Sequence, residues 1–117
     1  MAAYRERLHG VEGLGMPFAD APGVSAHHLA VVVLPEGTPR TQIQEAMRTD
    51  GVQTSVHYPP IHHFTAFADL SGRPLPQTES LAGRILTLPL FAHMTDLQVE
   101  TVCDALTRAV EGAAVRA

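Results

Sequence analysis

The clearest hydrophobic pattern in the chain lies near its C-terminus. Apolar residues recur there every three or four positions, as in a helix that buries one face; they are Val99, Val102, Cys103, Leu106 and Val110. Just before them, Thr95 and Gln98 have the spacing of a capping box, in which each side chain bonds to the other residue's backbone. The pattern predicts a helix that begins after Thr95 and ends at Gly112.

Three weaker patterns predict helices over residues 2–9, from Pro39 to Gly51, and over about residues 76–84. In the second of these, Ile43 and Met47 lie one turn apart on the predicted apolar face. Thr38 is the predicted N-cap, because its hydroxyl can accept a hydrogen bond from the first turn and Pro39 suits the first helical position.

Three short segments have the composition or the alternation of strands: residues 28–34, 52–58 and 85–89. In the second, every other residue from Val52 to Tyr58 is expected to pack on helices. The residues between them, Gln53, Ser55 and His57, are expected to form a polar face that points outward.

These elements indicate a single α+β domain spanning residues 1–117, with a small, mostly antiparallel sheet and helices packed on one face. Residues 59–76 lack any periodic pattern, and an ordered loop of this length is more often functional than not. Phe64 and Phe67 in this loop, and Phe91 further on, could line a pocket, but core packing is the favoured interpretation.

Composition narrows the classes of function. The net charge is −4 and there is no basic run, which argues against nucleic acid and anionic membranes as partners. The longest apolar run, residues 29–34, is too short to span a bilayer, and the charged N-terminus does not resemble a signal peptide, so we expect a cytoplasmic protein. All 8 basic residues are arginine, so no lysine can form a Schiff base.

Histidines supply the candidate chemistry. His57, His62 and His63 surround a stiff Pro59-Pro60 pair at the end of the second predicted strand. A metal site is disfavoured, because no cysteine or acidic residue lies at ligand spacing in the sequence. The single cysteine, on the apolar stripe of the last helix, is interpreted as a buried hydrophobic residue.

Several motifs occur together in a recognisable order. They are His-Tyr-Pro-Pro-Ile-His at 57–62, Leu-Pro-Gln-Thr-Glu at 75–79, Leu-Pro-Leu at 88–90 and the capping box at 95–98. In order and spacing they resemble the C-terminal part of the DegT/DnrJ/StrS family, the pyridoxal-phosphate-dependent sugar aminotransferases. The resemblance implies the C-terminal small domain of a fold-type I aminotransferase.

In such enzymes a larger domain binds the cofactor and supplies the Schiff-base lysine, and the small domain closes over the nucleotide-sugar pocket. The resemblance implies that His57, Tyr58 and His62, and less directly His28, contact the substrate. The expected reaction moves an amino group from an amino acid, typically Glu or Gln, to a nucleotide-linked keto sugar. The expected partners are the large pyridoxal-phosphate-binding domain or a full-length homologue, in a homo-oligomer.

The isolated chain is therefore expected to be inactive as a transaminase and to hold no covalent pyridoxal phosphate. Two alternatives remain open at this point. One is a non-catalytic module that binds a sugar nucleotide or regulates a homologue. The other is a histidine-based metal-binding domain.

Overall fold

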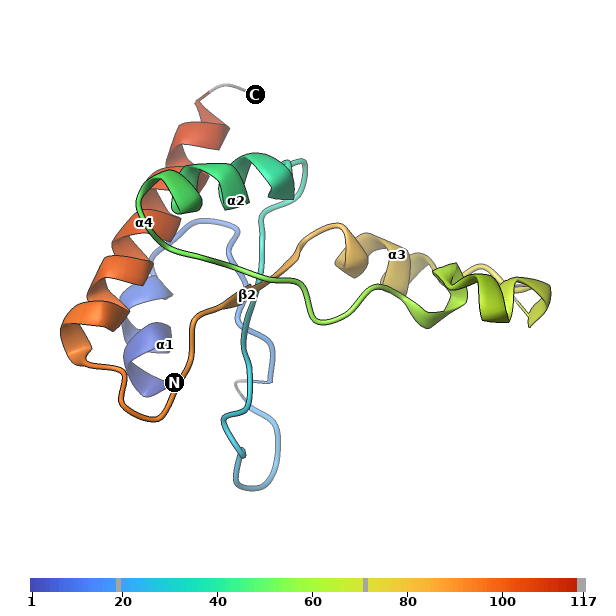
Figure 1. Ribbon diagram of the computed structural model, residues 1–117, viewed down its shortest axis with the longest axis horizontal. Coiled ribbons are helices and arrows are strands. Elements are labelled where there is room, and N and C mark those ends of the chain that lie inside the picture. Colours follow the sequence, from blue (N-terminus) through green and yellow to red (C-terminus); the bar gives the residue numbers. More distant parts are fainter. Residues whose placement is uncertain (19, 71, 116–117) are drawn as a thin grey trace.

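A computed structural model describes residues 1–18, 20–70 and 72–115 of the chain. Its helices are α1 (Ala2–Leu8), α2 (Arg40–Thr49), α3 (Pro76–Ala82) and α4 (Asp96–Ala114). Its strands are β1 (Ala30–Val33) and β2 (Ile85–Leu88). Two short 3₁₀ helices, η1 (Ile61–His63) and η2 (Thr65–Leu70), lie between α2 and α3. Figure 1 shows this arrangement, which is the α+β class that the sequence predicts.

The sheet is antiparallel and small. β1 pairs with β2 so that Ala30 lies opposite Leu88 and Val33 opposite Ile85. Single bridges extend it on both sides: Gly15 pairs with Val33, and Ser55 pairs with Thr87. Gly15 thus contributes a single bridge, and β1 is shorter than the predicted 28–34, leaving His28 outside it.

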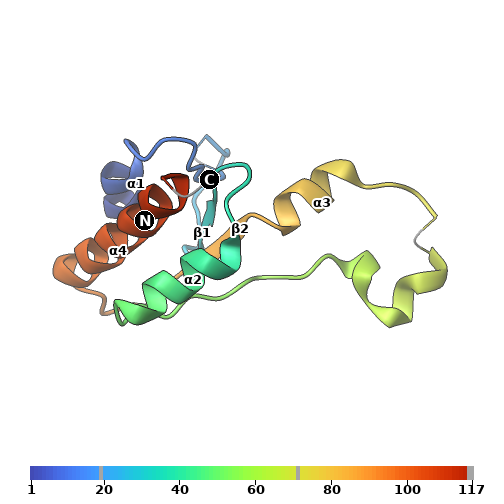
Figure 2. The ribbon, with the colours of Figure 1, turned by 90° about the horizontal axis from the view of Figure 1, so that it is seen from above.

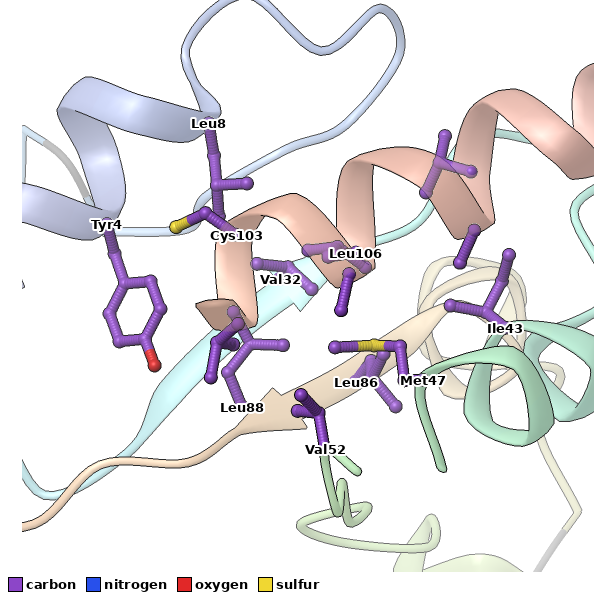
Figure 3. Packing of buried hydrophobic residues seen from close by; sticks show 14 of the residues in the cluster. Tyr4, Leu8, Val32, Ile43, Met47, Val52, Leu86, Leu88, Cys103 and Leu106 are labelled. Atoms are coloured by element: carbon purple, nitrogen blue, oxygen red, sulfur yellow. The ribbon is translucent and has the colours of Figure 1, made fainter. Parts of the chain in front are cut away.

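One face of the sheet forms the floor of the core. The paired residues Val32 and Leu86 are both fully buried there, beneath Leu106 of α4 (Figure 3). Helix α4 packs against both α1 and α2, and Figure 2 shows these three helices on the same side of the strands. Burying each such aliphatic side chain contributes about 1.5–3 kcal/mol, so this layer holds the fold together.

The last helix forms as its pattern predicts. The Thr95 side chain accepts from the Gln98 backbone and the Gln98 side chain accepts from the Thr95 backbone, which completes the capping box. The five predicted stripe residues are all buried. Cys103 is 2% exposed, and burial raises its thiol pKa to about 11, as befits a core residue.

Two predicted helix ends are wrong. Helix α4 continues through Gly112 to Ala114, because the added turn buries Ala113 against the core. Helix α2 begins at Arg40, with Pro39 rather than Thr38 at the N-cap and no side-chain cap. Gly51 does end α2, and its φ of 78° is the left-handed conformation that glycine adopts most readily.

Residues 52–58 do not form the predicted strand. Val52 is buried as expected, but only Ser55 pairs with β2, through backbone bonds of 3.1 and 2.8 Å to Thr87. The prolines that follow have no N–H with which to extend a ladder. At the end of the segment the expected faces are exchanged, since His57 is half-buried and Tyr58 is 67% exposed.

The segment from residue 58 to residue 82, which we call the arm, extends away from the core (Figures 1 and 2). It carries η1, η2 and α3, and none of its residues whose burial is described is buried. The radius of gyration, 15.3 Å, exceeds the value of about 13 Å typical of a compact chain of this length. The predicted long loop is thus a protruding structure with short helices.

None of the helices in the described part of the chain is long and apolar enough to cross a membrane.

The capping box gives a direct test of the α4 prediction. Replacing Thr95→Ala removes the hydroxyl that accepts from the Gln98 N–H, so the free energy of unfolding should fall by about 0.5–2 kcal/mol. Thr101→Ala in the same helix is the matched control, because its exposed hydroxyl only bonds back to the Leu97 carbonyl. Urea unfolding of both variants measures the difference, and equal effects would contradict the capping role.

Candidate functional site

His57 sits on the face of the sheet opposite the helices. The bridge between Ser55 and Thr87 holds the preceding backbone against β2, and the Thr87 side chain points away from the core layer. His57 Nδ1 lies 3.2 Å from Thr87 Oγ1 and 3.3 Å from Ser55 Oγ. The imidazole is therefore fixed through one ring nitrogen by two hydroxyl groups.

This arrangement leaves the other nitrogen for a ligand. Thr87 is only 5% exposed, and a buried hydroxyl needs a hydrogen-bond partner, which the imidazole provides. When Nδ1 accepts from the Thr87 hydroxyl, Nε2 carries the proton and can donate it outward. Among the described residues no partner is recorded for Nε2 of His57.

Tyr58 lies beside this imidazole on the surface. The two rings meet edge to face, with centroids 4.9 Å apart and planes at 90°. The peptide bond that joins His57 and Tyr58 is cis. Tyr58 thus offers an exposed aromatic ring and a phenol beside His57, a combination suited to contacts with a sugar ring or a base.

His62 lies further along the arm and is tied to α3. Its Nε2 and that of His63 both hydrogen-bond to Oε1 of Glu79, the His63 bond measuring 2.9 Å. These two hydrogen bonds lower the pKa of the Glu79 carboxyl below its usual range. His62 and His57 are in the same short segment, but their side chains have no recorded contact with each other.

Glu79 is the residue that the sequence analysis missed. The expectation that no acidic residue lies at ligand spacing is wrong, because the arm folds back and brings Glu79 to His62 across 17 positions. The signal was the Leu-Pro-Gln-Thr-Glu motif, in which Glu79 falls in the first turn of α3. The nitrogens of His62 and His63 and the carboxylate oxygen all lie within 4.8 Å of one another.

His28 stands apart from the other candidates. It is exposed in the segment that precedes β1, and no contact with His57, Tyr58 or His62 is recorded for its side chain.

The aromatic residues also differ from expectation. Phe64, Phe67 and Phe91 are 44%, 41% and 52% exposed, because no second layer of the described chain covers them.

Shallow hollows line the base of the arm. One, beside Pro59 and Pro60, is bordered by His63 and Glu79 and by Arg40 of α2. The other hollow is lined by His62 together with the apolar side chains of Phe67 and Leu75. The arm therefore presents alternating polar and apolar surface around the histidines.

The chain has no lysine, so it offers no side-chain amine to a carbonyl cofactor.

Curated relatives share this sequence over most of its length. The erythromycin biosynthesis sensory transduction protein EryC1 of Saccharopolyspora erythraea is 38% identical over 95 residues, covering 79% of this chain and 25% of the relative. The dTDP-4-dehydro-2,3,6-trideoxy-D-glucose 4-aminotransferase of Saccharopolyspora spinosa is 37% identical over 110 residues, covering 92% of this chain and 28% of the relative. The chain thus spans about a quarter of the length of these relatives.

Solved structures share the fold. A structure of DesI in the presence of its TDP-sugar product matches 98% of this chain with a TM-score of 0.83 and 31% identity, over 31% of that chain. A structure of DesV from S. venezuelae in complex with a ketimine intermediate matches 94% of this chain, with a TM-score of 0.81 and 30% identity, over 30% of that chain.

The sequence model of one family matches residues 1–107, which include every motif discussed above. Both the motif order predicted from the sequence and the fold agree with this match. The chain belongs to the DegT/DnrJ/EryC1/StrS aminotransferase family.

Proposed function

We propose that residues 1–117 are the C-terminal small domain of a pyridoxal-phosphate-dependent aminotransferase that acts on a nucleotide-linked keto sugar. In this proposal the domain supplies His57, Tyr58 and His62 to the nucleotide-sugar site. One observation carries it: His57 is fixed through Nδ1 by Ser55 and Thr87, with Nε2 directed away from its anchors. The relatives named for a dTDP-sugar substrate and a TDP-sugar product support the substrate class.

The cofactor must be held by another part of the enzyme. Pyridoxal phosphate, when bound, carries the amino group and stabilises the carbanion chemistry of transamination. Its attachment requires a lysine, and this chain has none, so its residues do not fit that role. The chain by itself is therefore inactive as a transaminase, and the large domain or a full-length homologue completes the site.

The contribution of this chain is to bind and orient the substrate. His57 Nε2 donates to an oxygen of the sugar or of its diphosphate, since the contacts at Nδ1 hold the ring in place. Tyr58 lies against the apolar face of the same substrate. His62 borders the substrate from the arm, where its hydrogen bond to Glu79 limits its motion. His28 is a weaker candidate, because it shares no recorded contact with this group.

The arm is the surface that meets the rest of the enzyme. Six of its large hydrophobic side chains are more than 40% exposed; they are Tyr58, Ile61, Phe64, Phe67, Leu75 and Leu81. Only 17% of the chain is charged, and clustered apolar side chains favour burial against another protein surface. We propose that the large domain and a second subunit of a homo-oligomer cover the arm. We also propose that the enzyme is cytoplasmic.

A non-catalytic module that binds sugar nucleotides is the second candidate, favoured by the absence of lysine. It uses the same histidines and the same tyrosine. The two proposals differ in whether this chain supports amino transfer when it is joined to a cofactor-binding domain.

A double-mutant cycle tests how His57 is held. His57→Ala leaves the buried Thr87 hydroxyl without its imidazole partner, so it should lower the free energy of unfolding by about 1–3 kcal/mol. In a Thr87→Val background the same change should cost less, because the hydroxyl is already gone. Urea unfolding of the four proteins in this cycle measures the coupling. Additive effects would show that the contact does not anchor the ring, and His28→Ala is the neutral surface control.

A further prediction tests the function. In the S. spinosa relative, the matching region would be replaced by this chain, and transamination of the dTDP sugar would be followed. Its His57→Ala variant should lose about 10- to 100-fold in kcat/KM for the sugar, the cost of one hydrogen bond to a charged or polar group. Cofactor binding, read from the visible absorbance of the bound pyridoxal phosphate, should not change.

Two controls accompany this experiment. His93→Ala alters an exposed histidine between β2 and α4 and should leave the kinetics unchanged. Thr87→Val keeps the imidazole but removes an anchor, so its loss should be intermediate. A folded chimera with no amino transfer would favour the non-catalytic module. Normal kinetics in the His57→Ala chimera would reject the substrate role of this residue.

A further inference from the structure

Two histidines and a carboxylate converge on the arm. His62 and His63 belong to η1, which follows the stiff Pro59-Pro60 pair, and Glu79 lies in the first turn of α3. Both imidazoles approach the same carboxylate oxygen, Oε1, through Nε2. Their rings meet edge to face with centroids 4.5 Å apart. Three potential ligand atoms from two separate elements therefore surround one small volume.

The hydrogen bonds show where a positive charge is favoured. Each Nε2 places a proton between its ring and Oε1, so two N–H groups point at a single anionic oxygen. Positive charge concentrated at this point is stabilised by the carboxylate. A divalent cation carries that charge on a single atom. When it displaces the two protons, each neutral imidazole binds it through the Nε2 lone pair that the proton had occupied.

The spacing suits a first-row transition metal. Zinc bonds to imidazole nitrogen and carboxylate oxygen are about 2.0–2.2 Å long, so neighbouring ligand atoms in a tetrahedral site are about 3.3 Å apart. The three ligand atoms lie within 4.8 Å of one another, and the His63 contact of 2.9 Å needs to open only slightly. The side chains are 21%, 49% and 47% exposed for His62, His63 and Glu79, which leaves them room to adjust and lets an ion enter from solvent.

We propose that His62, His63 and Glu79 form a binding site for a zinc-like divalent transition-metal ion. Imidazole nitrogen with carboxylate oxygen is the ligand set that such ions take, and three protein ligands leave a fourth position for water or an anionic group. The arm leaves the core through η1 and returns to it through α3. An ion bound by His62, His63 and Glu79 therefore links the outgoing and returning parts of the arm. The proposal does not depend on the aminotransferase function.

The test is to titrate the 117-residue chain with two metals. Calorimetry measures the binding of zinc, and visible absorption measures the binding of cobalt. We expect one ion per chain and, for cobalt, the intense bands of tetrahedral coordination. Glu79→Gln keeps the size of the side chain and removes the anionic ligand, and His63→Ala removes one imidazole. Each should weaken the affinity at least about tenfold.

The controls separate this cluster from the other histidines. His28→Ala and His93→Ala alter exposed histidines outside the cluster and should leave the affinity unchanged. Circular dichroism without metal checks that each variant folds. If His63→Ala does not fold, the metal affinity of Glu79→Gln alone tests the proposal. The proposal is overturned by three results: no saturable binding, binding that Glu79→Gln leaves intact, or binding lost in His28→Ala or His93→Ala.

Discussion

The burial of the α4 stripe against β1 and β2 is the interaction on which the rest of the structure depends. Val32 and Leu86 on the sheet meet Leu106 on the helix, and all three are fully buried. The same helix supports α1 and α2, so four elements lose their packing surface if it is removed. This single layer also decides which face of the sheet stays open, because α1, α2 and α4 all pack on the other one.

The proposed substrate contacts lie where this packing ends. Thr87 is on β2, yet its side chain lies on the face opposite the core and holds His57. From there the chain leaves the sheet as the arm, which has no buried residue among those described and returns only at β2. The core therefore carries a polar anchor and an extension with exposed apolar side chains. This division fits a domain that shapes a shared site rather than one that encloses its own.

The sequence predicted the elements whose signals are local. The capping box at Thr95 and the stripe that includes Leu106 are set by spacing within one helix, and both are confirmed. The strand over residues 52–58 was wrong because alternation within a segment does not show whether a neighbouring strand pairs with it. Glu79 was missed because its approach to His62 depends on how the arm folds back over 17 positions. The phenylalanines of the arm were placed in the core because composition cannot show that no layer of the described chain covers them.

The central claim is that a self-sufficient core carries an arm whose covering surface lies elsewhere. Hydrogen–deuterium exchange of the chain alone, resolved by segment, tests it most directly. Amides of β1, β2 and α4 should exchange slowly, at rates set by global unfolding, whereas those of η1, η2 and α3 should exchange orders of magnitude faster. Protection of the arm equal to that of α4 would show that the arm is packed in the isolated chain, and would contradict the account.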